Sequence, residues 1–343
     1  MNRRIIMELS TNNDIRIREY QNAYILPDEQ CLFAFDADGH FIENTSKRKV
    51  GKEEYAICDD LTGSEECDYV DEEVFYLGFI RSHWGHFMVD GTVRMWGLLE
   101  NISKGKKILA NIEGRQSFFE EWFGLFGIDA KKDIIKPQKL TRYKKIYIPD
   151  VSYYPGHYIS DSFIAPFRHV ADVIKEDLET YDKIYLSRSR ISRGSKQLGE
   201  ASVEKVFAAT GFKVLYPEEI PFRHQIWYYS HCKTLVTTTG TIAHNILFAA
   251  PGTELIILDR YPLEPSHQSV INRAARARVQ NIPAYAKGSN HENNLMCFTP
   301  ELKEYCRREG IKIKDDAGSH IRIALTTLFF RIPKAYKLYW LFH

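Results

Sequence analysis

The sequence predicts an α/β protein with two doubly wound domains, and three observations lead to this fold class. The chain has 343 residues, which is long enough for two hydrophobic cores. Apolar strand-like runs alternate with helical runs through both halves of the chain, as they do in α/β domains. Residues 234–259 read as a strand, a helix and a second strand, a unit whose two strands must be parallel.

Composition narrows the classes of function. Hydrophobic residues form 44% of the chain and charged residues 27%, which is ordinary for a globular protein. The formal net charge of +1 argues against a broadly basic nucleic-acid binder. The cysteines include no C-x-x-C pair, the N-terminal apolar run is too short for a signal peptide, and no stretch approaches the roughly 20 apolar residues of a membrane span. We therefore expect a cytoplasmic protein with reduced thiols that does not cross the membrane.

The first domain is predicted over residues 1–180. Its N-terminal part has a weak pattern and contains Asp36 and Asp38 in a D-x-D arrangement. Two carboxylates at this spacing could bind a metal ion, but Asp38 and Gly39 between two apolar segments form a hairpin-turn pattern, which is the favoured interpretation. Further along, strands are predicted at 74–80, 107–110, 133–135 and 145–148, and helices at 92–101, 118–126 and 162–180.

A polar cluster interrupts the junction between the strand at 74–80 and the helix that follows it. If the chain is already helical from Gly85 onward, His86 and Asp90 are four residues apart and share one face. Such a pair could act as a general base and its orienting partner, or as a base and a phosphate contact. Alternatively, His86 caps the helix and Asp90 bonds a neighbouring loop.

The segment 151–160 is an aromatic loop that includes Tyr154 and His157. It follows the strand at 145–148, and open α/β sheets bind ligands at the carboxyl ends of their strands. We therefore predict that Tyr154 and His157 contact a substrate.

The second domain is predicted over residues 181–316. Its strands are expected at 183–186, 213–216, 234–239 and 254–258, and its helices at 200–210, 223–230, 266–279 and 300–309. Three arginines, Arg188, Arg190 and Arg193, follow the end of its first strand directly. They would form an anion site at a strand terminus, or else a solvated basic loop.

A turn of small residues, Thr239, Gly240 and Thr241, follows the strand at 234–239 and opens the next helix. It can bring backbone N–H groups and hydroxyls to the positive end of that helix, an arrangement that suits a diphosphate. Any parallel sheet contains units of this kind, so the turn alone does not identify a ligand.

The last segment, residues 317–343, contains no Asp or Glu and carries basic residues among aromatic ones. A basic, aromatic segment can lie on an anionic membrane surface, here the inner face of the cell membrane. Packing back onto the first domain is the other possibility, and the sequence does not separate the two.

Three separated motifs together resemble glycosyltransferase family 61. The first is GHFMVD at 85–90, and the second is YLSR at 185–188 followed by Arg193. The third runs from HQI at 224–226 through TGT at 239–241 and NILF at 245–248 to Pro251 and Gly252. Their order and spacing fit from about residue 75 to 260. The chain departs from the family pattern at Thr239 and His224, where a histidine and a glutamate are usual, and these departures bear on the donor sugar and the nucleotide base.

The resemblance implies a GT-B-like architecture, with two Rossmann-like domains facing a cleft. It implies an inverting glycosyltransferase that uses a nucleotide-sugar donor, expected to be UDP-linked, and a glycan or lipid-linked glycan acceptor, in cell-surface or capsular polysaccharide biosynthesis. Asp90 would be the base, with His86 orienting it or the acceptor. The donor would be bound by Arg188, Arg193, Gln225, Thr239, Gly240, Thr241, Asn245 and Asp259.

No metal or other cofactor is expected, because arginines and a helix N-terminus can supply the positive charge that a leaving diphosphate needs. Two alternatives stay open from the sequence. One is another polysaccharide-modifying transferase, of the pyruvyl transferase type. The other is a non-catalytic protein that binds a sugar or a nucleotide.

Overall fold

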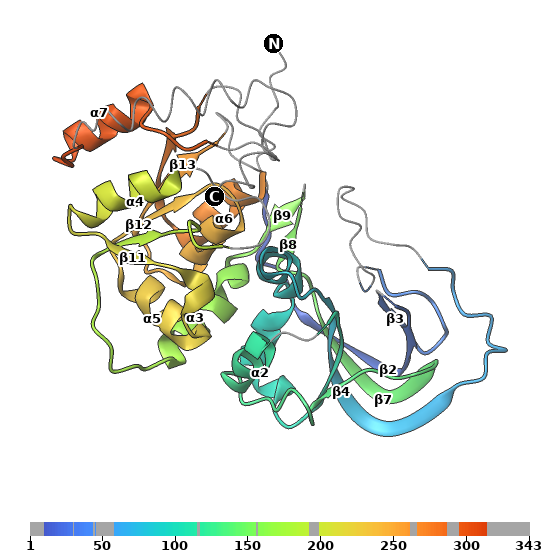
Figure 1. Ribbon diagram of the computed structural model, residues 1–343. Coiled ribbons are helices and arrows are strands. Elements are labelled where there is room, and N and C mark those ends of the chain that lie inside the picture. The colour runs from blue at the N-terminus through green and yellow to red at the C-terminus, as the bar shows by residue number, and fades with distance from the viewer. Residues whose placement is uncertain are drawn as a thin grey trace, which may run out of the picture. The chain divides into compact units, whose positions relative to one another are not determined.

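The computed structural model describes residues 10–29, 31–43, 45, 58–114, 117–155, 157–191, 199–260, 266–286 and 295–313, and the structural statements below concern these residues (Figure 1). The chain folds into two compact units, Met1–Ile174 and Lys175–His343. The sequence analysis placed the boundary between residues 180 and 181. The predicted terminal segment 317–343 and the predicted donor contact Arg193 lie outside the described residues.

The first unit is built on a six-stranded sheet with the order β3-β2-β7-β4-β5-β6. Its strands are β2 (Ile17–Pro27), β3 (Leu32–Phe35), β4 (Asp68–Ile80), β5 (Lys107–Ile112), β6 (Ile134–Ile135) and β7 (Thr141–Pro149). Strands β7, β4, β5 and β6 are parallel, whereas β2 is antiparallel to both β7 and β3. Figure 1 shows β2, β7 and β4 as long, curved neighbours. The sheet is therefore mixed, and the predicted doubly wound pattern is present only in its parallel part.

The helices of the first unit are short. They are α1 (Trp84–His86), the π-helix η1 (Phe87–Gly91), the 3₁₀ helices η2 (Met95–Leu99), η3 (Asn101–Ser103) and η4 (Asp161–Ile164), and the α-helices α2 (Ser117–Gly124) and α3 (Ala165–Val173). The predicted helix at 92–101 is thus two 3₁₀ turns, and the one predicted to reach residue 180 ends at Val173. A Cβ on Gly97 in η2 would lie 2.8 Å from Pro149 Cγ and 2.9 Å from Phe75 Cζ, so only glycine lets this segment pack so closely on the sheet.

A small second sheet completes the first unit. It contains β1 (Ser10–Thr11), β8 (Tyr153–Tyr154) and β9 (Tyr158–Ile159), in the order β1-β9-β8. The aromatic segment predicted as a loop after β7 is therefore a tight hairpin, β8–β9, with β1 alongside.

The second unit is a five-stranded, wholly parallel sheet with the order β11-β10-β12-β13-β14. Its strands are β10 (Lys183–Leu186), β11 (Lys213–Leu215), β12 (Thr234–Thr238), β13 (Glu254–Asp259) and β14 (Arg278–Pro283). Numbered along the chain this order is 2-1-3-4-5, one of the two common doubly wound orders. The fifth strand corrects the sequence analysis, which continued the preceding helix to residue 279.

Helices connect these strands, and the last helix follows β14. They are α4 (Glu200–Ala208), η5 (Pro217–Glu219), α5 (Phe222–His231), the 3₁₀ helix η6 (Thr241–Phe248), α6 (Ser266–Ala275) and α7 (Pro300–Arg308). Side chains of α4 and α7, such as Phe207 and Leu302, share one core with Val236 and Ile256 of the sheet. Figure 1 shows α5 on the opposite side of the sheet from α4. The predicted strand–helix–strand unit is confirmed, with a 3₁₀ rather than an α-helical crossover.

Among the described residues, no helix combines the length and the apolar composition that crossing a membrane requires. No two of the six cysteines, all of which lie in the described part of the chain, form a disulfide bond.

Candidate functional site

The carboxyl ends of β10 and β12 lie side by side in the second unit. From this point the chain builds the sheet in two directions, through β11 on one side and through β13 and β14 on the other. Loops that leave neighbouring strands in opposite directions open a crevice, which is where doubly wound sheets bind their ligands. The loop after β10 carries Arg188, and the loop after β12 carries Thr239, Gly240 and Thr241. The structure therefore brings these predicted residues to neighbouring strand ends.

Two glutamates of α4 hold the loop after β10 in place. Glu204 Oε2 accepts hydrogen bonds from the hydroxyls of Ser187 and Ser189, each at 2.7 Å. One helical turn earlier, Glu200 Oε1 accepts a hydrogen bond from the backbone N–H of Arg188 at 3.0 Å. The backbone of Arg188 is thus fixed from three neighbouring points. Within the described part of the chain, its guanidinium forms no ion pair.

Arg190 has a different role from Arg188. Its guanidinium lies 2.8 Å from a carboxylate oxygen of Glu219 and 3.7 Å from the centre of the Tyr216 ring. Both contacts are made within the second unit, and they leave Arg190 as a cation already paired by the fold.

Glu200 is completely buried, and its second carboxylate oxygen, Oε2, has no hydrogen-bond partner in the described structure. Burial raises the pKa of Glu200 to about 7, although the N–H group and the positive charge of Arg188 act in the opposite direction. Tyr185, also buried, directs its hydroxyl to Oε1 at 3.4 Å. The carboxyl that holds the Arg188 backbone therefore changes its charge close to neutral pH.

The turn after β12 is held by a contact between two predicted residues. The Thr239 hydroxyl donates to Asp259 Oδ1 at 2.5 Å and accepts from the backbone N–H of Arg260 at 3.3 Å. Asp259 is 3% exposed, so this hydrogen bond satisfies a buried carboxylate oxygen. Gly240 follows with a φ of +123°, a region open to glycine, and η6 begins at Thr241. The first N–H groups of such a helix lack partners within the helix and can serve an anion.

Two further predicted donor contacts are occupied or enclosed within the fold. The Gln225 side-chain amide donates to the carbonyls of Pro217 and Ile220, each at 2.8 Å, and its oxygen accepts from Tyr229 at 3.1 Å. Asn245 lies within η6 and is only 3% exposed. In this structure Gln225 braces the connection into α5, and the donor contacts of both residues stay predictions.

In the first unit, His86 and Asp90 lie together as the sequence analysis predicted. The distance from His86 Nδ1 to Asp90 Oδ2 is 3.2 Å, and the two side chains are 35% and 24% exposed. They follow the end of β4, where α1 continues into the π-helix η1. π-Helical turns are rare and often occur at functional sites. Phe87, which lies between them in the sequence, is fully buried, and its ring centre lies 5.0 Å from that of Trp122. This packing anchors the turn.

His83 belongs to the same cluster and was not singled out by the sequence analysis. Its ring centre lies 5.3 Å from that of His86. Burial lowers the pKa of His83, and the neighbouring His86 and Arg81 lower it further. The neutral form of His83 is therefore favoured. The spacing of the two histidines in SHWGH was the one signal in the sequence that could have identified it.

Tyr154 and His157 face each other across the turn of the β8–β9 hairpin. Their rings are 4.2 Å apart and nearly parallel, with an interplanar angle of 23°. The hairpin follows the carboxyl end of β7, the position that the sequence analysis gave it. His157 is exposed and Tyr154 is half-buried, and contact of the pair with a substrate stays a prediction.

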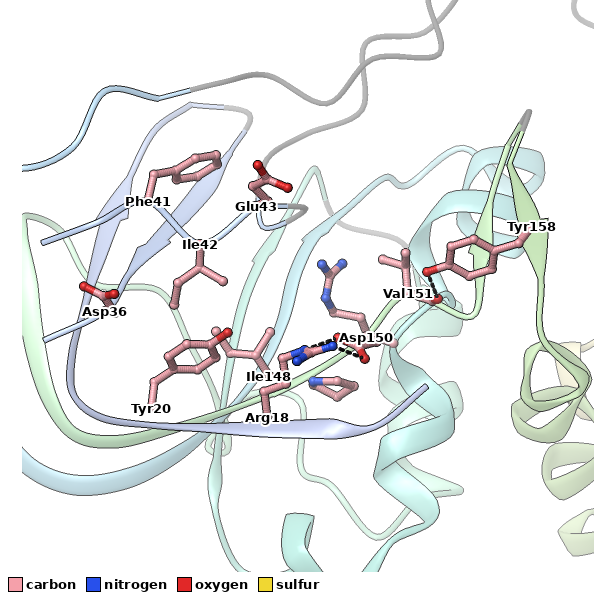
Figure 2. A pocket seen from close by; sticks show the side chains of 12 residues that line it. Arg18, Tyr20, Asp36, Phe41, Ile42, Glu43, Ile148, Asp150, Val151 and Tyr158 are labelled. Carbon is pink, nitrogen blue, oxygen red and sulfur yellow. Dashed lines mark hydrogen bonds and ion pairs between the residues drawn. The ribbon is translucent and has the colours of Figure 1, made fainter. Parts of the chain in front are cut away.

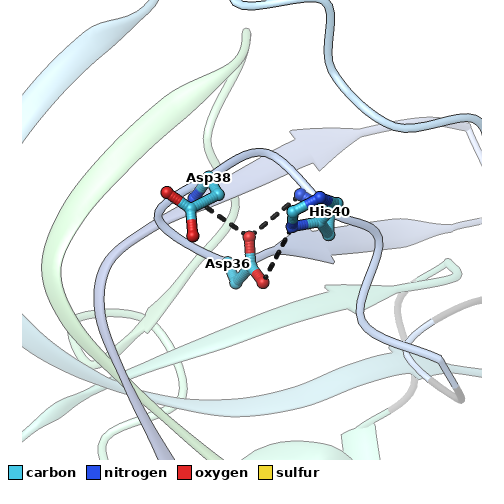
Figure 3. Close-up of side chains that lie close together, drawn as sticks. All are labelled: Asp36, Asp38 and His40. Carbon is cyan, nitrogen blue, oxygen red and sulfur yellow. Dashed lines mark hydrogen bonds and ion pairs between the residues drawn. The ribbon is translucent and has the colours of Figure 1, made fainter.

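The D-x-D pattern forms a turn. Asp36 Oδ1 accepts hydrogen bonds from the backbone N–H groups of Asp38 and His40 at 3.0 and 2.9 Å (Figure 3). Phe35 and Phe41 pair across the turn as antiparallel neighbours, so the hairpin interpretation is confirmed. The ligand atoms of Asp36, Asp38 and His40 lie within 4.8 Å of one another, but the carboxylate of Asp36 serves the backbone of its own turn.

Comparison with known protein families gives a match. The model of a family described as Glycosyltransferase 61 matches residues 84–256, half of the chain. The matched range begins at α1 and ends within β13, so it contains the His86–Asp90 pair and the loops after β10 and β12, and it stops three residues before Asp259. No curated protein matches the chain.

Proposed function

The chain belongs to glycosyltransferase family 61, and on that basis we propose that it is an inverting glycosyltransferase. Family membership supports glycosyltransferase activity in general. The proposal adds a nucleotide-sugar donor, expected to be UDP-linked, and a glycan or lipid-linked glycan acceptor in cell-surface or capsular polysaccharide biosynthesis.

The observation that carries the donor half of the proposal is the placement of Arg188. Its backbone is held by Glu200, its neighbours by Glu204, and it follows β10 beside the turn that opens η6. As the sugar leaves, negative charge grows on the nucleoside diphosphate. A guanidinium and helix N-terminal N–H groups set in position beforehand stabilise that charge without reorganising. We propose that Arg188, Gly240 and Thr241 contact the diphosphate.

The acceptor half rests on Asp90 and His86. In an inverting displacement the acceptor oxygen bonds to the anomeric carbon while the bond from that carbon to the phosphate oxygen breaks. The acceptor proton passes to a base in the same step. A carboxylate is ionised at neutral pH and can take this proton. We propose Asp90 as the base, and His86, 3.2 Å away, as the residue that orients it or the acceptor.

The proposal also includes three features that were expected from the sequence. They are a GT-B arrangement in which both units serve one reaction, activity without a metal ion, and work at the cytoplasmic side of the membrane. Two functions compete with it. A transferase of the pyruvyl type would use phosphoenolpyruvate, and a non-catalytic relative would bind a nucleotide sugar without turning it over.

A thermal-shift screen of the full chain separates these functions. The ligands are UDP-, GDP- and CMP-sugars and phosphoenolpyruvate, each followed by an assay for release of the nucleotide in the presence of oligosaccharide acceptors. A ligand at 100 times its Kd stabilises the protein by about 2.7 kcal/mol, which is readily visible. We expect stabilisation by one nucleotide-sugar class together with turnover. Stabilisation by phosphoenolpyruvate alone would reject the proposal, and nucleotide binding without turnover would favour the non-catalytic alternative.

A further inference from the structure

A pocket of about 380 Å³ lies in the first unit, on the side of the sheet formed by β2 and β7 (Figure 2). Arg18 and Tyr20 reach into it from β2, and Asp150 follows the end of β7. Ile42 and Glu43, just beyond the 36–40 turn, border it opposite Tyr20, and Tyr158 of β9 stands at one end. Apart from Asp36 in the D-x-D turn and the segment 151–160, the pocket residues belong to none of the motifs discussed above, and the proposed function gives the pocket no role.

An ion pair that spans two strands organises the polar floor of this pocket. Arg18 donates to both carboxylate oxygens of Asp150, from Nε at 2.7 Å and from Nη2 at 3.1 Å. The indole N–H of Trp96 donates to the Asp150 carbonyl at 2.9 Å and fixes the backbone there. The Arg18 and Asp150 side chains keep 48% and 22% of their surface exposed. Such a pair offers hydrogen-bond donors and acceptors in fixed directions, which suits a ligand with hydroxyl groups on adjacent carbons.

Aromatic side chains form the walls. Tyr20, Phe41 and Tyr158 are all half-buried and line the same space. The Tyr158 hydroxyl donates to the carbonyl of Val151 at 3.0 Å, which holds its ring in place. A pyranose ring has apolar C–H faces and a polar rim, and it matches a site with aromatic walls and a polar floor.

The charges in the pocket select between ligand classes. Its lining contains three carboxylates, from Asp36, Glu43 and Asp150, and two guanidiniums, from Arg18 and Arg94. The balance is slightly negative, so a phosphate or a uronate would meet net repulsion, whereas a neutral sugar would not. The volume lies near the lower end of the range for small-molecule sites, which suits a short piece of glycan better than a complete nucleotide sugar.

The pocket is joined to the segment that carries the proposed base. Arg94 lines the pocket and follows Asp90 by four residues. Ser152, just after Asp150, donates from both its N–H and its hydroxyl to the Val93 carbonyl at 2.8 Å. The chain segments 90–94 and 150–152 therefore form one structure. We infer that this pocket binds a neutral sugar unit of the acceptor glycan, an inference that rests on the proposed function.

The test is ligand-observed NMR on the full chain with neutral methyl glycosides of glucose, galactose, mannose, xylose and N-acetylglucosamine. Glucuronate and inorganic phosphate are the charged comparisons. The test variant is Tyr20→Leu, which removes an aromatic wall but keeps apolar bulk. The matched control is Tyr69→Leu, because Tyr69 is 58% exposed and lies outside the pocket. Glu43→Gln, at an exposed position, is a second test variant that does not disturb the core.

We expect at least one neutral glycoside to bind, Tyr20→Leu to weaken it about 2- to 10-fold, and Glu43→Gln to weaken it about 10-fold. The control Tyr69→Leu should bind like the unaltered protein. Binding that is equal in all three variants, preference for glucuronate or phosphate, or no binding by any neutral glycoside would overturn the inference. If no neutral glycoside binds but a nucleotide sugar still stabilises the protein, the inference about the pocket fails and the proposed function stands. Glycoside binding without any nucleotide response would instead reject the proposed function.

Discussion

The charge of Glu200 makes the stability of the second unit depend on pH in a way that can be measured. The unfolded chain ionises this carboxyl near its ordinary pKa of 4.5, whereas burial raises the pKa to about 7 in the folded state. Between these values the folded protein binds a proton that the unfolded chain has released, so the free energy of unfolding falls as the pH rises. Above about pH 7 Glu200 is ionised in both states, and the free energy of unfolding has fallen by about 3 kcal/mol in total.

The variant Glu200→Gln removes this dependence. Glutamine keeps an oxygen that can accept the hydrogen bond from Arg188, and it stays neutral at every pH. Relative to the unaltered protein, the variant should gain stability steadily as the pH rises. For a folding unit of this size about 3 kcal/mol corresponds to roughly 6–12 °C in Tm.

Differential scanning calorimetry across this range, from weakly acidic to weakly basic buffer, is the assay. The control is Glu301→Gln, which changes an exposed glutamate in the first turn of α7. Because Glu301 is exposed, this variant should not reproduce the growing gain in Tm expected of Glu200→Gln. Parallel curves for Glu200→Gln and the unaltered protein would refute the reasoning, because they would show that Glu200 titrates equally in the folded and unfolded states.

Four further outcomes are expected. Asp90→Asn should keep donor binding in calorimetric titration and lose at least about 10²-fold in kcat, whereas normal turnover in this variant with an inactive His86→Ala would make the histidine the base. Arg188→Ala should weaken donor binding by about 1.5–3 kcal/mol, and Arg188→Lys should restore it only in part. The control Arg190→Ala should leave donor affinity unchanged. Equal losses of affinity in the two alanine variants would contradict the assignment of Arg188 as the diphosphate contact. Glu204→Gln should raise the donor KM while leaving kcat within about 2-fold, since it loosens the loop after β10 without touching the base; an unchanged KM would contradict this. Activity should survive EDTA, and a loss that Mn²⁺ restores would show that a metal takes part.

The sequence predicted well where residues that act together are close in the chain. His86 and Asp90 are four residues apart, and helical geometry brought them together as expected. The strand–helix–strand unit at 234–259 followed from apolar runs and a glycine turn, and its strands are parallel. The hairpin at Asp36–His40 followed from its turn residues in the same way.

Contacts between residues far apart in the sequence, and strands without an apolar pattern, could not be predicted. Glu200 and Glu204 reach the Ser187–Ser189 loop only because α4 folds back beside β10, and nothing in their spacing indicates it. The strand Arg278–Pro283 was missed because most of its side chains are exposed and only Ile282 is buried, so it lacks the apolar run of its neighbours. β2 was missed for a similar reason, since fully buried side chains occur only in its second half.

The tight packing at Gly97 has a consequence for how this protein can diversify. The backbone of η2 lies directly against Pro149 at the end of β7 and Phe75 in β4, with no room for even a methyl group. The distance between η2 and the sheet is therefore fixed by direct contact of the η2 backbone with the side chains of Pro149 and Phe75. Side chains outside this contact, such as that of the exposed His157, can be exchanged without altering that separation. Position 97 itself tolerates no such exchange, and we expect selection for activity to recover only glycine there.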